Sequence, residues 1–179
     1  MLQLFRLFLG VSLLKKGPQD VPYSLFLFVI LFLIVFVLDV IGMQVPDSKG
    51  NAFAMIDILR YLVIDKAIIL SVIFLIFHMH GYKNRYLQSI TAIYGFEFLL
   101  ETIHLPLNLF TVQVAADNPN ILVLVFFVYM FLFGWLLMVV YHVLRQALSI
   151  TMLHAAVLSV GLFSLDLYIG SLLLPELSS

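Results

Sequence analysis

One segment of the sequence carries ionisable residues at helical spacing. Glu97, Glu101 and His104 stand at positions i, i+4 and i+7, so an α-helix presents all three on one face, with Tyr94 one turn earlier. Carboxylates on such a face can bind a cation or relay protons when they are buried without enough counter-charges. The alternative is structural: a network of internal salt bridges, completed by water, that orients the helices.

Further charged residues interrupt other apolar segments. Three aspartates and two basic residues join the first group, so the candidate site consists of Asp39, Arg60, Asp65, Lys66, Glu97, Glu101, His104 and Asp166. At about 1.5 Å of rise per residue, the five carboxylates come from four expected helices and fall in the same half of a bilayer. Charged groups are costly in hydrocarbon and must face the bundle interior, a partner or water. Two bases cannot pair with five carboxylates one to one.

Metal and haem chemistry would use the same residue types. Glu101-x-x-His104 is similar to the carboxylate–histidine element of di-iron bundles, but such a site needs this element on two helices, and the sequence has one copy. His78-x-His80, His142 and His154 could ligate a haem only if two rings met at equal depth. Anchoring at the membrane interface explains these histidines without a ligand. We therefore expect no metal, no cofactor and no catalytic residues.

Composition defines the class of protein. The chain has 179 residues, of which 64% are hydrophobic and 11% are charged, whereas about a quarter of a soluble domain is charged. This composition predicts a membrane protein. A net charge of -1 with scattered basic residues excludes a nucleic-acid binder. The absence of cysteine excludes disulfides and thiolate metal sites.

Five stretches are long and apolar enough to cross about 30 Å of hydrocarbon. They cover about 23–43, 57–80, 85–104, 121–144 and 150–174. The third is expected to stop at Pro106 and to be followed by a loop from Asn108 to Asn120, which offers a possible docking surface around Asp117. Residues 1–16 are shorter than a span and contain polar residues, which favours an interfacial helix. The sequence thus predicts an all-α polytopic membrane helix bundle: five transmembrane helices and a short N-terminal interfacial helix in a single membrane domain, 1–179.

The basic residues predict the orientation of this bundle, because loops rich in lysine and arginine stay cytoplasmic. One expected face carries Arg6, Lys15, Lys16, Lys83, Arg85 and Arg145, and the other carries Lys49 and Arg60. We therefore expect a cytoplasmic N-terminus and a periplasmic C-terminus in a bacterial inner membrane.

Small residues recur along the last expected span. Ala155, Ser159, Gly161 and Gly170 have side chains that allow another helix to approach closely. They predict packing against a second span or against another protein.

Three segments carry a resemblance to a known family. Residues 17–24 before the first span, 85–92 at the start of the third and 135–148 late in the fourth resemble small bacterial inner-membrane proteins of the broad Yip-like, five-span class. In eukaryotic members of this class a long hydrophilic tail precedes the spans, and the proteins bind partner proteins in vesicle traffic. The residues before the first span are few and largely apolar here, which departs from that pattern. The resemblance implies a non-enzymatic protein that binds other membrane proteins.

Two functions follow from these observations. The first is an accessory or scaffold subunit that packs in the lipid bilayer against other integral membrane proteins, or forms a homo-oligomer. The alternative is a small cation- or proton-coupled transporter or channel that uses the acidic cluster, with Lys66 as an internal counter-ion. Five spans without a visible inverted repeat argue against the alternative.

Overall fold

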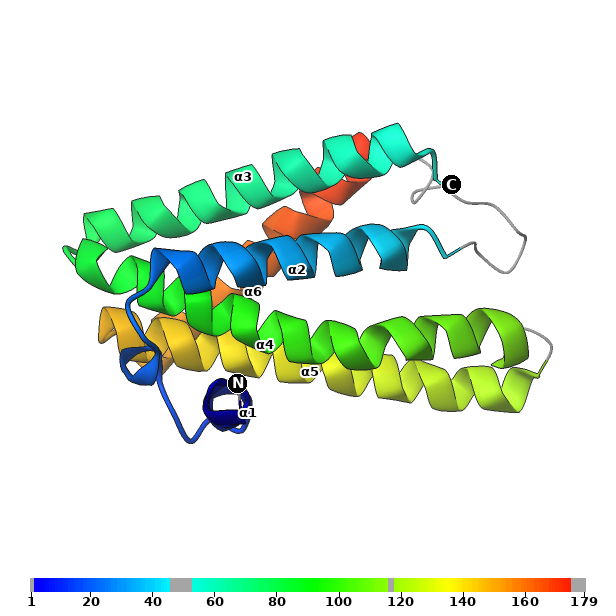
Figure 1. The fold of residues 1–179 in the computed structure, drawn as a ribbon, viewed down its shortest axis with the longest axis horizontal. Coiled ribbons are helices and arrows are strands. Elements are labelled where there is room, and N and C mark those ends of the chain that lie inside the picture. Colours follow the sequence, from blue (N-terminus) through cyan, green and yellow to red (C-terminus); the bar gives the residue numbers. More distant parts are fainter. Residues whose placement is uncertain (1, 46–52, 116–117, 175–179) are drawn as a thin grey trace.

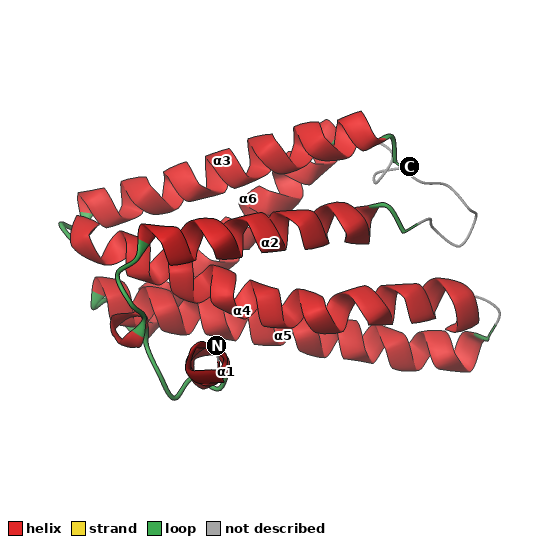
Figure 2. Cartoon of the chain, viewed as in Figure 1, coloured by secondary structure: helices red, strands yellow, loops and turns green. Residues whose placement is uncertain are grey.

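The computed structural model describes residues 2–45, 53–115 and 118–174. Within these ranges the chain is helical and contains no strand, which confirms the predicted all-α helix bundle. The helices are α1 (Leu2–Ser12), α2 (Leu25–Met43), α3 (Met55–Met79), α4 (Lys83–Phe110), α5 (Pro119–Leu148) and α6 (Met152–Leu173). A 3-10 turn at Pro18–Asp20 precedes α2, and a π-helical turn at Thr111–Ala115 extends α4. Loops join the helices at the ends of the bundle (Figure 2).

Helix α4 occupies the middle of the bundle. Helices α2, α4 and α6 run in one direction along the long axis, and α3 and α5 run in the other (Figure 1). Helix α4 packs against α1, α2, α3 and α5, while α6 packs against α5 and α3. Helix α1 crosses the others and is viewed nearly end-on (Figure 1).

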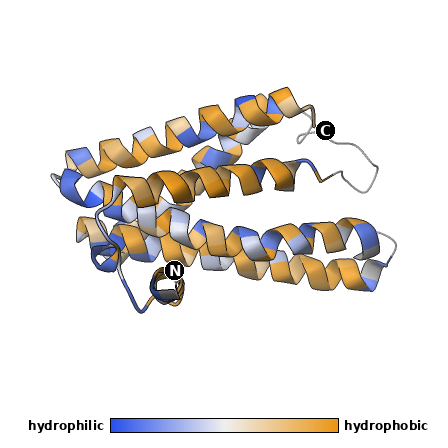
Figure 3. Ribbon diagram, viewed as in Figure 1, coloured by the Kyte–Doolittle hydropathy of each residue, from blue (hydrophilic) through white to orange (hydrophobic). Residues whose placement is uncertain are grey.

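Four helices, α2, α3, α5 and α6, are long and apolar enough to cross a membrane. Hydrophobic residues cover most of α2 and α5 (Figure 3). Many large apolar side chains on these helices are exposed, which suits contact with lipid tails. The chain is therefore an integral membrane protein. Helix α4 is long, with 28 residues, but its polar residues exclude it from these four helices.

Helix α4 corrects one prediction. It does not stop at Pro106 but continues to Phe110 and into the π-helical turn, so the loop expected from Asn108 is wrong as far as Ala115. A proline removes one backbone donor, so the helix loses one hydrogen bond at Pro106 but continues past it. Asn108 holds this end, because its Nδ2 donates to Gly42 O at 3.4 Å and its Oδ1 accepts from Tyr129 at 3.3 Å. Asp117 lies outside the described residues.

The other spans shift by a few residues, for local reasons. Helix α2 begins at Leu25 because the Ser24 side chain accepts a hydrogen bond from Leu27 N. Thr151 caps the start of α6 in the same way. Helix α5 runs on to Leu148 and ends where Ser149 adopts a left-handed φ of 53°.

Helix α1 docks on the bundle through a close contact. The Phe8 ring lies on Gly95 of α4, and a Cβ at Gly95 would overlap that ring. Trp135 of α5 donates a hydrogen bond to Ser12 O at 2.7 Å. Phe5 and Leu9, four residues apart on α1, are exposed. A packed stripe and an apolar exposed stripe suit a helix at the edge of the hydrocarbon region.

An apolar core fills the end of the bundle where α3 turns into α4. Gly81, with a φ of 78°, makes that tight turn. The core consists of Ile73, Phe77, Ile90, Leu144, Ala147, Leu148 and Leu162. From this turn α3 and α4 diverge (Figure 1). Asp65 and Lys66 stand near the middle of α3, and Glu97 stands near the middle of α4.

Candidate functional site

A cavity of about 570 Å³ lies between the five long helices. Most of its lining is apolar, and the polar lining residues are Asp39, Tyr61, Asp65, Lys66, Tyr94, Glu97, Glu101, His104, Asn108, Ser159 and Asp166. The lining reaches Met43, Val45 and Phe53, where α2 ends and α3 approaches its start. The cavity thus extends inward from that end of the bundle and stops at the apolar core around Phe77.

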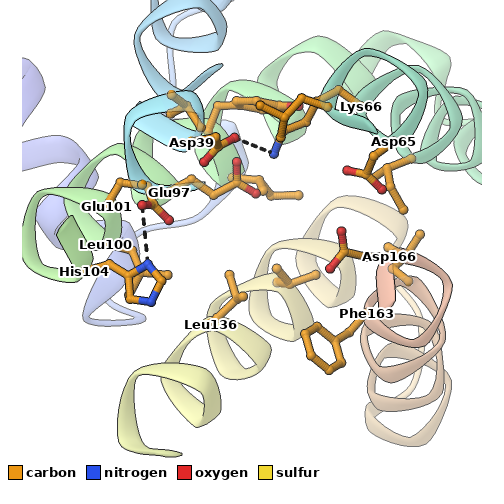
Figure 4. A pocket seen from close by; sticks show the side chains of 18 of the residues that line it. Asp39, Asp65, Lys66, Glu97, Leu100, Glu101, His104, Leu136, Phe163 and Asp166 are labelled. Atoms are coloured by element: carbon orange, nitrogen blue, oxygen red, sulfur yellow. Dashed lines mark ion pairs between the residues drawn. The ribbon is translucent and has the colours of Figure 1, made fainter. Parts of the chain in front are cut away.

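The first charged group in the cavity surrounds Lys66. Its Nζ lies 3.1 Å from Asp39 Oδ2, and the two side chains are only 18% and 14% exposed. The Tyr94 ring lies 5.8 Å from Nζ. Glu97 extends from α4 toward this pair (Figure 4), and its buried Oε2 has no hydrogen-bond partner among the described residues. One lysine therefore faces two carboxylates.

The second group joins α3 and α6. The carboxyl groups of Asp65 and Asp166 point toward each other (Figure 4). Asp65 is 3% exposed, and its Oδ1 has no hydrogen-bond partner in the described part of the chain. The Tyr61 hydroxyl donates to Asp166 Oδ1 at 3.5 Å. No ion pair joins either aspartate to a basic residue within the described ranges. Two adjacent carboxyl groups of this kind favour a shared proton or a bound cation.

The third charged group lies nearer the end of the bundle that carries Met43 and Phe53. His104 Nδ1 is 3.5 Å from Glu101 Oε2, one turn apart on α4. The His104 ring meets the Tyr129 ring of α5 edge to face, with 5.3 Å between centroids. Its position is therefore set by α5 as well as by its own helix.

The structure brings seven of the eight candidate residues to one cavity and leaves out Arg60. Arg60 is exposed and does not line the cavity. It precedes Asp65 by five residues, which turns it roughly 140° away around the helix. Sequence reasoning missed Tyr61, although it precedes Asp65 by four residues and so shares its face.

The small residues of α6 are mostly used within the bundle. Ala155, Ser159 and Gly170 are buried, and a Cβ at Gly170 would lie 3.8 Å from the Tyr61 ring. Gly161 differs, because it is exposed and a Cβ there would meet nothing within 4 Å. Close approach of another protein is thus possible at Gly161.

Three of the four other histidines have separate partners. His80 Nδ1 lies 2.9 Å from Ile76 O, and His142 Nε2 lies 3.1 Å from Lys16 O. His154 Nδ1 lies 2.6 Å from the hydroxyl oxygen of its own capping threonine. Among the described residues no three histidine, aspartate or glutamate side chains are grouped so that they could hold a metal ion. The carboxylates of the cavity, rather than these histidines, therefore form the candidate site.

Comparison with models of known protein families, with curated proteins and with solved structures finds no match to this chain. The resemblance to the Yip-like class stays a prediction. A functional proposal depends on the cavity and its charges.

Proposed function

We propose that the chain is a small transporter or channel that admits a cation or a proton to the acidic cavity and moves it across the membrane. The observation that carries this proposal is that two buried carboxylate oxygens in one cavity, Asp65 Oδ1 and Glu97 Oε2, have neither a hydrogen bond nor an ion pair with any described residue. Asp39 Oδ2 also lacks a hydrogen bond, but it lies 3.1 Å from Lys66 Nζ. Ionisable groups within a membrane bundle are costly, and ion or proton pathways are a common reason for them.

The proposal includes a topology of five spans. Helix α4 is 28 residues long, roughly 42 Å at 1.5 Å per residue, which exceeds the hydrocarbon thickness. It packs along α2 and α5, and Glu97, Glu101 and His104 face the cavity rather than lipid. These contacts favour a fifth span despite its polar residues.

The same proposal places the cavity relative to the cell. The end of the bundle that the apolar core around Phe77 fills also carries basic residues, namely Lys83, Arg85 and Arg145. Arg85 donates a hydrogen bond to Ala147 O there, at 3.0 Å. Positively charged loop ends favour the cytoplasm. The N-terminus would then be cytoplasmic and the C-terminus periplasmic in a bacterial inner membrane, and the cavity would open to the periplasm.

Proton flux into liposomes tests this function. The purified protein is reconstituted with a pH-sensitive dye inside, and a potassium diffusion potential drives protons inward. Glu97→Gln should reduce the flux to the level of empty liposomes, because it removes the charge of a carboxylate whose buried Oε2 has no hydrogen-bond partner among the described residues. Asp57→Asn is the matched control, since Asp57 is an exposed carboxylate on α3 that does not line the cavity. Equal proton flux for wild type and Glu97→Gln would refute a proton pathway through Glu97.

The accessory-subunit function remains the second candidate, and Gly161 is the observation in its favour. This exposed glycine allows a helix of a larger membrane complex to approach closely. Extraction in mild detergent and affinity capture should then yield a stoichiometric membrane partner that Gly161→Leu releases. A chain that purifies alone and is active would exclude this function.

A further inference from the structure

We infer that the cavity is built for an organic ammonium ion with an apolar body, such as an arylalkylamine, rather than for a bare metal ion. This inference rests on the proposed function, because it names the class of cation that the same cavity admits.

The size and lining of the cavity suit an organic ligand. Its volume of about 570 Å³ lies within the range of roughly 300–1,000 Å³ typical of small-molecule sites, which are mostly apolar with a few placed polar groups. Helices α3, α5 and α6 supply much of the apolar lining, which includes Leu62, Ile69, Leu136, Val140, Leu162 and Phe163. A metal ion needs several oxygen or nitrogen ligands around one point, and no such group is found in the described part of the chain.

The charges of the cavity place the ammonium group between α3 and α6. Lys66 is already paired with Asp39, so that part of the cavity has its own cation. Asp65 and Asp166 face each other, and Asp65 Oδ1 lacks a partner among the described residues. An alkylammonium has three donors, enough to bond both carboxyl groups at once. Such a ligand would satisfy the unpartnered oxygen and supply the missing positive charge.

The same geometry places the apolar body of the ligand. Phe163 lies nearly one turn before Asp166 on α6, and both residues line the cavity with Leu136 of α5 (Figure 4). The Phe163 ring is held by Phe133, with 4.5 Å between the ring centroids. An aromatic ring two carbons from the ammonium could therefore lie against Phe163 and Leu136 while the ammonium contacts the aspartates.

Equilibrium binding of radiolabelled 2-phenylethylammonium to the full chain in nanodiscs tests the inference. Wild type should bind more probe than empty nanodiscs, and unlabelled 2-phenylethanol, the neutral analogue, should not compete. Asp166→Asn and, separately, Asp65→Asn should each weaken binding at least about tenfold, which corresponds to about 1.4 kcal/mol. Asp57→Asn should bind as wild type does, because Asp57 lies outside the cavity lining.

Two results would overturn the inference: probe binding no greater than that of empty nanodiscs, or equal competition by the neutral alcohol. The emission of Trp135, the single tryptophan of the chain, checks that each variant is folded. If wild type binds no amine while proton flux still depends on Glu97, the ligand class is wrong and the proposed function stands. If binding depends on Asp166 while proton flux does not depend on Glu97, the ligand class stands and the proton pathway fails.

Discussion

At the scale of single residues, Lys66 is the basic residue around which the carboxylates of Asp39 and Glu97 lie in the cavity. It is the one lysine or arginine among the described residues that lines the cavity, and it faces both Asp39 and Glu97. Removing one partner from a buried ion pair leaves the other charge uncompensated, which is more harmful than replacing both.

Lys66→Met should therefore destabilise the fold by about 2 kcal/mol or more. The double variant Asp39→Asn/Lys66→Met should recover part of that loss, because it removes one of the two uncompensated carboxylates. Unfolding in mixed micelles at increasing denaturant concentration measures both free energies. Equal stability of wild type and Lys66→Met would show that the pair contributes nothing.

The sequence predicts which residue types are buried better than it predicts their partners. The spacing of Glu97, Glu101 and His104 predicts a shared face, and all three line the cavity. The exclusion of Arg60 and the role of Tyr61 depend on how α3 is rotated about its own axis. That rotation is set by the packing of α3 against α4 and α6. A single sequence does not show which helices pack together.

At the scale of elements, α1 is held by one glycine and one tryptophan. Phe8 occupies the space that a side chain at Gly95 would need. Trp135 joins the end of α1 to α5 through Ser12 O and packs edge to face against Phe96, at 5.3 Å between centroids. As the single tryptophan, it reports on the docking of α1.

Gly95→Ala should displace Phe8 and destabilise the fold by about 1–3 kcal/mol, since overpacking outweighs the better helix propensity of alanine. The emission of Trp135 should shift as it loses its hydrogen bond to Ser12. Gly161→Ala on α6 is the matched control, because a Cβ there would meet nothing within 4 Å; it should leave the emission unchanged. Unchanged emission and stability in Gly95→Ala would contradict the docking contact.

The helices themselves are more predictable than their ends. Long apolar runs predict α2, α3, α5 and α6, and Ser24 and Thr151 act as ordinary helix caps. Pro106 leads to a wrong helix end, because the rule that proline ends a helix considers only neighbouring residues in the sequence. Contacts of Asn108 with α2 and α5 hold the last turns of α4, and these contacts exist only in the assembled bundle.

At the scale of the whole molecule, the bundle is asymmetric along its axis. Apolar side chains around Phe77 and Leu148 fill one end, and the charged cavity extends inward from the other. This asymmetry arises because α3 and α4 meet at Gly81 and then diverge. Sequence reasoning predicts carboxylates at a common depth. The cavity depends on the angle between α3 and α4, which composition and spacing do not determine.

The proposed transport function and its ligand class both require that the cavity contain water and open to one face, and thiol accessibility tests this most directly. The chain has no cysteine, so Leu136→Cys, in the cavity lining, and Ile103→Cys, 43% exposed and outside the cavity lining, each carry a single thiol. Thiols react as thiolates, which form in water and not in lipid.

A cationic, membrane-impermeant thiol reagent should modify Leu136→Cys from the face that carries Met43 and Phe53, and not from the face that carries Lys83 and Arg85. Ile103→Cys should react from neither face. If Leu136→Cys also stays unmodified from both faces, the cavity is dry and closed, and the account of a cation-admitting bundle is contradicted.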